Sequence, residues 1–500
     1  MSDAVSKSAT PAMGQRSGWP VWAVVLLCLI PAGAYYTFLI CANFGDLDSG
    51  LHPAAPGLYV PVHYGLTFNS MLLHLLHFRF DVDPQAIGVE GSVRDGLTYA
   101  YFGIVPALLR APLMQARDFA TTDYTRLACL VAISAMSACK VATVMTVWRA
   151  AGRSEQRPLL IILLAATLFG GPQIQFLMAS LWQEVGLWSA ALASLFVYLA
   201  VRGLYDTDGF SPRLLAGMAV VAGFCLLTRV STALGLYLAL GLSMLALMWR
   251  DVRGAERYRF RDALRRVLPA GAILGCFIVI AFAINFARWG SPLAFTGDIH
   301  SSLIAMQTDP LRVARDAQYG QFNLIRVGYA LAYYFAPVWA LQDSSGHFYL
   351  ESFRQRAIDS VELPPSSFFI SDPLSIGLMI VGLIALARSR LDSRRERSAP
   401  AWPILAGLAV PIALMLTYAS MTFRYRLEFY PLFDFCAVVG FAALIARPRA
   451  VTIVPAALAG LLGMVASHGL LVLSALGLYG DTMPKLGGGS VMTFYASFFQ

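Results

Sequence analysis

The sequence predicts an all-α polytopic membrane protein that forms a single membrane-embedded domain over residues 1–500. Hydrophobic residues make up 58% of the chain and charged residues only 13%, whereas soluble domains contain about 25% charged residues. Apolar runs close to the ~20 residues that cross a bilayer recur along the chain. Because a backbone in lipid has to satisfy its own hydrogen bonds, these runs are expected to be helices.

The apolar runs predict about eleven transmembrane helices. In chain order, the predicted spans are residues 19–41, 125–148, 158–171, 185–203, 213–229, 232–249, 267–287, 372–388, 402–419, 431–446 and 452–478. The stretch from 158 to 203 is interrupted by Gly170-Gly171-Pro172 and by Glu184. The seven cysteines lie in or at the ends of spans, so no disulfide framework is expected.

Basic residues set the predicted orientation, because Lys and Arg collect in short cytoplasmic loops. With the N-terminus in the cytoplasm, more than half of the 37 Lys and Arg residues fall in such loops. The long segments 42–123 and 288–371 then lie outside the cytoplasm, and so does the C-terminus. The net charge of +8 follows from this topology and indicates no nucleic-acid partner.

The two long outer segments carry predicted structure of their own. In the first, residues 64–78 are expected to form a helix at the membrane interface, and Asp95-Gly96 to form a hairpin turn between short strands. Residues 105–115 predict a short helix with Arg110 facing the interface. In the second, the apolar stretch 322–340 predicts a helix lying on the membrane, with tyrosines at the headgroup boundary. A further transmembrane span is the alternative for that stretch.

Long segments on one face can build the polar chamber that a membrane enzyme needs, so a membrane-embedded transferase is the leading hypothesis. Transfer of a sugar from a lipid-phosphate donor needs a carboxylate base for the acceptor hydroxyl. Asp46 and Asp48 follow the first span and are the first candidates, with a solvated pair as the alternative. Glu184 lies at the mouth of a span between two tryptophans, where a carboxylate needs a partner or a function. Asp81 is expected to lie in a solvated loop.

The leaving phosphate needs cations near the headgroup plane. Arginines that fall near the outer boundary are Arg110, Arg229, Arg326, Arg424 and Arg426; ordinary snorkelling is the alternative for each. Arg229 lies in a tight bend between two spans. Arg424 and Arg426 share the parity of a strand, so both could face one site.

Lys140 lies inside the predicted span 125–148. A charge at that depth costs ~2.5–3.5 kcal/mol or more, so an ionic partner or a cavity is expected. His74 and His77 are one helical turn apart but have no matched third ligand, so no metal site is assigned. No cofactor is indicated, although a divalent metal stays possible. No nucleotide-binding loop or hydrolase motif occurs.

Four short stretches resemble bacterial multi-pass glycosyltransferases of the GT-C superfamily, the class of protein mannosyltransferase-like and aminoarabinose transferase-like enzymes. They are residues 75–81 together with 95–109, 223–229, 285–293 and 423–431. The resemblance implies a GT-C fold, a polyprenyl-phosphate sugar donor, and an acidic base in the first outer loop, often near the end of the first span. Asp46 and Asp48 match that position loosely, and the sequence departs from the pattern because it has no clean Asp-Asp or Asp-Glu pair.

Together these features predict an enzyme of the bacterial inner membrane that moves a sugar from a polyprenyl-phosphate to an envelope glycan or lipid at the periplasmic face. Asp46 or Asp48 would be the base. Arg229, with Arg424 or Arg426, would bind the phosphate, Glu184 would orient a substrate, and Lys140 would contribute to substrate binding. One alternative is a polymerase or ligase of lipid-linked glycans. The other is a transporter or flippase, which predicts charges deep in several spans.

Overall fold

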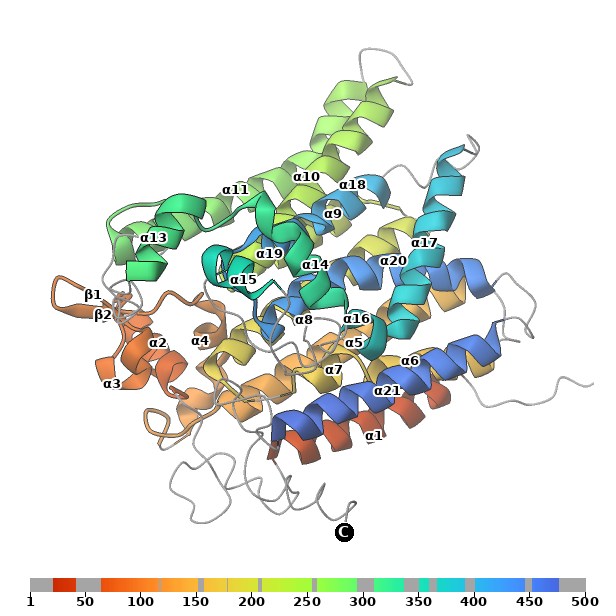
Figure 1. Ribbon diagram of the computed structural model, residues 1–500. Helices are drawn as coiled ribbons and strands as arrows, with labels where there is room; N and C mark the ends of the chain where they lie inside the picture. Colours follow the sequence, from red (N-terminus) through yellow and green to blue (C-terminus); the bar gives the residue numbers. More distant parts are fainter. Residues whose placement is uncertain are drawn as a thin grey trace, which may run out of the picture.

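The computed structural model describes residues 21–41, 64–116, 118–151, 157–177, 179–205, 209–253, 259–294, 310–336, 350–358, 367–391, 401–445 and 452–475. The molecule is a bundle of helices with smaller elements gathered at one end (Figure 1). The helices of the bundle are α1 (Val21–Cys41), α5 (Thr125–Ala151), α6 (Arg157–Phe169), α8 (Leu181–Tyr205), α9 (Pro212–Leu226), α10 (Val230–Arg253), α11 (Arg259–Trp289), α17 (Pro373–Leu391), α18 (Ala401–Leu408), α19 (Val410–Thr417), α20 (Tyr430–Ile445) and α21 (Ile453–Ala475).

The predicted polytopic architecture is confirmed. Within the described residues, six helices are long and apolar enough to cross a bilayer. Shorter apolar helical segments cover Pro212–Leu226, Pro373–Arg388, Ala401–Thr417, Tyr430–Ile445 and Ile453–Gly469. Each of the predicted spans overlaps one of these helices, because uninterrupted apolar runs of this length leave the helix as the only way to pair the backbone in lipid. The helix boundaries agree to within about four residues, except that α11, the helix of span 267–287, begins at Arg259.

The predicted interruption after residue 169 is present. Gly171 takes a φ of +60°, a conformation that costs glycine little and other residues more, and Pro172 opens the four-residue helix α7 (Pro172–Gln175). Helix α6 therefore ends at Phe169, and the chain continues through the buried α7 before α8 begins. Helices broken in this way are tolerated in membranes where the turn is buried in protein or lines a cavity.

The first outer segment is a small unit with its own core. It contains α2 (Thr67–Leu75), α3 (Pro84–Ile87), η2 (Gly88–Glu90), β1 (Ser92–Arg94), β2 (Leu97–Tyr99), α4 (Val105–Leu109) and η3 (Ala111–Gln115). The predicted hairpin is confirmed, since Arg94 pairs with Leu97 across Asp95 and Gly96, whose φ values are +52° and +78°. Phe68 from α2 is fully buried in the core of this unit.

The second outer segment contributes α13 (Pro310–Tyr319), η5 (Leu324–Arg326), α14 (Val327–Phe335), α15 (Glu351–Ala357) and α16 (Phe368–Ser371). The nine residues of α14 are too few to cross a bilayer, so the further-span alternative is excluded. Tyr333 and Tyr334 are both buried; Tyr334 packs against Phe429, and so does the neighbouring Phe335. The placement of the tyrosines at the headgroup boundary stays a prediction.

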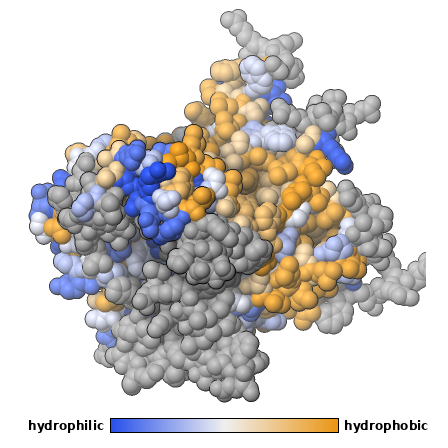
Figure 2. Space-filling view, in the orientation of Figure 1, coloured by the Kyte–Doolittle hydropathy of each residue, from blue (hydrophilic) through white to orange (hydrophobic). Residues whose placement is uncertain are grey.

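The hydropathy of the surface differs between the helical bundle and the end that carries the smaller elements. Hydrophobic surface spreads over the helical bundle, whereas hydrophilic residues gather at the end that carries the hairpin and α13 (Figure 2). The hydrophobic surface of the bundle includes exposed side chains of α1 such as Trp22 and Ile30, both 66% exposed. Between α19 and α20 the chain forms the 3-10 helix η8 (Phe423–Glu428), which separates the polar end from the interior of the bundle.

Candidate functional site

Buried ion pairs connect segments that are far apart in the sequence. They join Arg110 to Glu184 at 2.5 Å, Arg229 to Glu428 at 2.5 Å, Arg426 to Asp372 at 3.2 Å and Lys140 to Asp434 at 2.8 Å. A buried charge left alone is costly, so these pairs constrain how the helices and outer segments can fit together.

The Arg110–Glu184 pair fastens the first outer segment to the bundle. The Arg110 guanidinium also donates to Asn69 Oδ1 at 2.5 Å and to Thr125 Oγ1 at 3.2 Å. The expectation that Arg110 faces the membrane interface is therefore wrong, because the carboxylate in the first turn of α8 draws it inward and leaves it 1% exposed. Glu184 is fully buried, and its role in orienting a substrate stays a prediction.

The Arg229–Glu428 pair fastens the bend after α9 to η8. Ser231 and Thr232 also donate to the Glu428 carboxylate, at 2.6 and 2.7 Å. Gly103 of the first outer segment packs directly against the backbone of this bend. A Cβ at Gly103 would lie only 2.2 Å from the Leu227 carbonyl oxygen. Arg229 is thus held beside the first outer segment with most of its charge already balanced.

Arg424 differs from Arg110, Arg229 and Arg426, which are each paired with a carboxylate. Within the described part of the chain no carboxylate lies at ion-pair distance from it, and it is partly exposed. Its guanidinium lies over the ring of Trp182 at 5.5 Å and over the ring of Tyr425 at 5.7 Å. Aromatic faces attract a guanidinium without neutralising it, so Arg424 keeps its charge available to an anion.

A tyrosine and a carboxylate from the first outer segment complete this group. The Tyr101 hydroxyl donates to Glu90 at 2.7 Å. Burial raises the pKa of Tyr101, and the neighbouring Glu90 raises it further, whereas Arg424 and Trp182 oppose the rise. We call Glu90, Tyr101, Trp182, Arg229 and Arg424 the outer cluster, since four separate segments bring them together at the polar end of the bundle.

The expectation that Arg424 and Arg426 face one site is wrong. Residues 423–428 form a 3-10 helix, in which positions two apart point in different directions because a turn takes three residues. Arg424 points toward the other residues of the outer cluster. Arg426 points into the bundle, where it is 1% exposed and its guanidinium lies 4.1 Å from the centre of the Phe368 ring. Its buried position separates it from the outer cluster.

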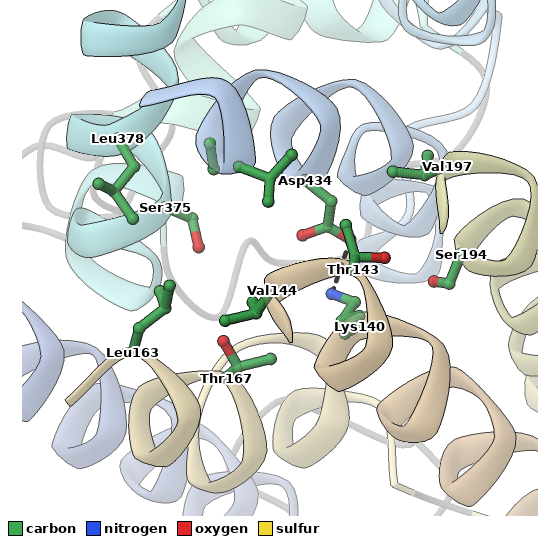
Figure 3. Close-up of a pocket in the computed structure, with 12 residues that line it drawn as sticks. Lys140, Thr143, Val144, Leu163, Thr167, Ser194, Val197, Ser375, Leu378 and Asp434 are labelled. Atoms are coloured by element: carbon green, nitrogen blue, oxygen red, sulfur yellow. Dashed lines mark ion pairs between the residues drawn. The ribbon is translucent and has the colours of Figure 1, made fainter. Parts of the chain in front are cut away.

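Lys140 has both the partner and the cavity that its depth predicts. Its ammonium pairs with Asp434 of α20, and the two side chains face an open space between α5, α6, α17 and α20 (Figure 3). Asp434 and Asp372 were not among the predicted site residues. The sequence signal for Asp434 was present, since it is a carboxylate inside the predicted span 431–446.

Asp46 and Asp48 lie outside the described residues. The expectation of a solvated Asp81 is wrong, because Asp81 is 4% exposed and is bound by Arg79 and His74. No group of three or more His, Cys, Asp or Glu side chains within the described ranges is arranged to hold a metal ion.

No protein-family model and no curated protein matches the chain. Among solved structures, the oligosaccharyltransferase AglB from Archaeoglobus fulgidus, in complex with an inhibitory peptide and a dolichol-phosphate, is 13% identical with a TM-score of 0.49, over 97% of this chain and 60% of that one. Its apo form gives 12% identity and a TM-score of 0.47, over 95% and 59%. ArnT from Cupriavidus metallidurans, bound to undecaprenyl phosphate, is 13% identical with a TM-score of 0.46, over 96% and 69%.

This chain spans about 60% of the length of the AglB structures. At these identities and TM-scores, the chemistry of this chain has to be argued from its own residues.

Proposed function

We propose that the protein is a GT-C-type membrane glycosyltransferase that moves a sugar from a polyprenyl-phosphate donor to an envelope glycan or lipid acceptor. We place the reaction at the periplasmic face of the bacterial inner membrane. The observation that carries the proposal is the outer cluster, in which a charged and partly exposed Arg424 is held between aromatic rings at the polar end of a membrane bundle.

In this proposal Arg424 binds the donor phosphate. A guanidinium presents two parallel N–H donors that match two phosphate oxygens, and stacking on Trp182 fixes the plane of the fork. Arg229 has the supporting role of holding η8 against the α9–α10 bend, because Glu428 already balances its charge. Arg426 lies too deep in the bundle to share the same phosphate.

The reaction needs a base for the acceptor hydroxyl, and we keep Asp46 and Asp48 in that role. The acceptor oxygen loses its proton to the carboxylate and forms a bond to the anomeric carbon. The bond from that carbon to the phosphate oxygen breaks, and the leaving phosphate carries the electron pair away beside Arg424. Glu90 is a second carboxylate that lies in the outer cluster itself.

The test uses the full chain in proteoliposomes, with a panel of radiolabelled sugars on polyprenyl phosphate and an envelope lipid extract as acceptor. Arg424→Gln should lower the rate of transfer by at least tenfold, mainly by raising the KM for the lipid donor. Arg265→Gln is the matched control. Arg265 lies near the start of α11, away from the outer cluster, and its side chain is 66% exposed, so this variant should leave transfer unchanged.

Two carboxylate variants separate the candidate bases. Asp46→Asn combined with Asp48→Asn should reduce kcat by at least a hundredfold, as expected for loss of a general base, whereas Glu90→Gln should act more weakly. Unchanged transfer in the double variant would remove Asp46 and Asp48 from the mechanism. Failure of the wild-type chain to transfer any sugar of the panel would contradict the proposed function.

The flippase alternative is favoured by one observation, the charged pairs of Lys140 with Asp434 and Arg426 with Asp372 inside the bundle. The same proteoliposomes distinguish it from the enzyme. A flippase would move labelled lipid between leaflets and leave the sugar on its phosphate, whereas a transferase releases polyprenyl phosphate.

A further inference from the structure

The interior of the bundle contains a polar space that the outer cluster does not use. Two adjoining cavities lie between α5, α6, α17 and α20, the first also lined by α8 and the second by α21, and they share Lys140, Leu163, Thr167, Ser375 and Asp434 in their walls. In Figure 3 the Ser375 and Thr167 side chains point toward the same open space as the ion pair. We call this space the inner chamber.

The inner chamber lies among apolar helices. Lys140 is 11 residues from Ala151, the end of α5 on the predicted cytoplasmic side, which is about 16 Å at ~1.5 Å per residue. Asp434 is 4 residues from Tyr430, the opposite end of α20, which is about 6 Å. A polar cavity among apolar helices is costly to maintain without a polar occupant.

The charges that face the chamber balance one another. Lys140 is matched by Asp434. Asp372 Oδ2 accepts from Arg426 at 3.2 Å, from Gln175 at 3.1 Å and from the Tyr430 hydroxyl at 3.0 Å. With each cation already paired to a carboxylate, the lining has no net charge to favour a phosphate or a free metal cation.

The polar atoms that remain without partners include a donor and two acceptors. Gln173 is fully buried and lines the chamber, and neither its Nε2 nor its Oε1 has a hydrogen-bond partner within the described residues. Gln175 Oε1 is also unpartnered. Buried polar groups of this kind are nearly always satisfied in native structures, and a hydroxyl is the uncharged group that both donates and accepts.

The size of the chamber suits a group larger than single waters. The two cavities leave about 50 and about 40 Å³ open to the centres of water molecules, and one water needs ~10–15 Å³ of such space. Together they hold the equivalent of roughly six to nine waters, comparable to one monosaccharide. Val144, Leu163 and Leu378 form an apolar wall against which the C–H face of a ring can pack.

We propose that the inner chamber binds an uncharged polyol of monosaccharide size, through the Gln173 amide and the hydroxyls of Thr167 and Ser375. This site is separate from the outer cluster, since Arg424 contacts Trp182 and Tyr425 whereas Arg426 is buried and pairs with Asp372. The proposal does not depend on the transferase activity. The polyol can be a free sugar or the sugar head of a glycolipid, because both present the same hydroxyls.

The test measures the thermal unfolding midpoint of the full chain in nanodiscs with three probes. Methyl glucoside represents a free sugar, octyl glucoside below its micelle concentration represents a sugar with a lipid-like tail, and tetraethylene glycol monooctyl ether carries the tail without the sugar. We expect a saturable rise in the midpoint with octyl glucoside and none with the ether. Stabilisation by methyl glucoside as well would identify a free sugar as the source.

Variants locate the binding in the chamber. Gln173→Leu should weaken the apparent Kd for octyl glucoside at least tenfold, and the near-isosteric Thr167→Val gives a second reading if Gln173→Leu does not fold. Gln355→Leu, on the exposed α15, should bind as wild type, and so should Arg424→Gln. The proposal is overturned if neither glucoside stabilises the wild type, which would mean that the chamber holds water only, or if both chamber variants bind as tightly as wild type.

Discussion

At the scale of single residues, the charged side chains inside apolar segments mark where the bundle is held together. Glu184 stands out in the sequence because it lies at the mouth of a span between two tryptophans, and Lys140 because a lone charge in a predicted span is costly. The structure supplies a partner for each, Arg110 and Asp434. The outer cluster instead contains Arg424, whose charge is stacked on aromatic rings and not neutralised by a carboxylate of the described residues.

Removing one partner of the Arg110–Glu184 pair should destabilise the fold. Glu184→Gln leaves the Arg110 guanidinium buried with no counter-charge, and we expect a loss of about 3–5 kcal/mol in the free energy of unfolding. Glu351→Gln is the control, because it opens a partly exposed pair with Arg354 and should cost under about 1 kcal/mol. Denaturant titration in mixed micelles measures both; equal losses would show that burial of the pair does not matter.

The Asp81 carboxylate should make stability depend on pH. Burial raises the pKa of Asp81, but bonds from Arg79, the backbone and His74 outweigh it, so the pKa lies below its ordinary value of 3.8. A lowered folded-state pKa stabilises the fold fully above the ordinary value, and this stabilisation is lost as the pH falls through the lowered pKa. The difference in unfolding midpoint between wild type and Asp81→Asn should therefore shrink below about pH 4.

A matched variant checks the cause of that pH dependence. Asp95 lies at the tip of the hairpin with its side chain 80% exposed. Asp95→Asn should give a small difference from wild type that stays nearly constant over the same pH range. A difference for Asp81→Asn that grows on acidification would contradict the assigned ion pair.

At the scale of elements, α17 and α20 approach each other so closely that each needs a glycine at the crossing. A Cβ on Gly382 would lie 1.9 Å from the Cys436 carbonyl oxygen, and a Cβ on Gly440 would lie 2.0 Å from the Leu378 carbonyl oxygen. Small residues allow helix backbones in membranes to pack at short distance. This contact carries Asp434 and Asp372 into position beside the inner chamber.

Gly382→Ala should separate α17 from α20 and destabilise the bundle by about 1–3 kcal/mol, as overpacking does in well-filled cores. Gly377→Ala on the same helix is the control, because nothing lies within 4 Å of a Cβ at that position, and it should be neutral or slightly stabilising. Thermal unfolding in nanodiscs measures both. An equal response of the two variants would refute the close helix contact.

At the scale of the whole molecule, the bundle places the outer cluster at one end and the inner chamber between its helices. Labelling by a membrane-impermeant thiol reagent tests the predicted orientation. Asp95→Cys should react in intact cells, and Arg265→Cys should react only after the membrane is opened, each measured against the wild-type background. The reverse pattern would place the outer cluster in the cytoplasm and remove the proposed periplasmic reaction.

The positions of the apolar helices, the break at Gly170-Gly171-Pro172 and the hairpin at Asp95-Gly96 follow from the sequence by itself. Each depends on the composition of a continuous stretch or on the backbone preferences of a few adjacent residues. The sequence also showed which charged residues lie in or beside apolar segments. It did not identify their ionic partners, and it did not predict that Arg110 is buried.

The tertiary structure decided which charges are neutralised and which one stays available. Arg229 and Glu428 are 199 residues apart in the chain, and no local pattern encodes a contact at that separation. The different directions of Arg424 and Arg426 depend on residues 423–428 forming a 3-10 helix between two spans. An apolar run determines its own helix through its own backbone hydrogen bonds, whereas a site needs side chains that several helices bring together only when they pack.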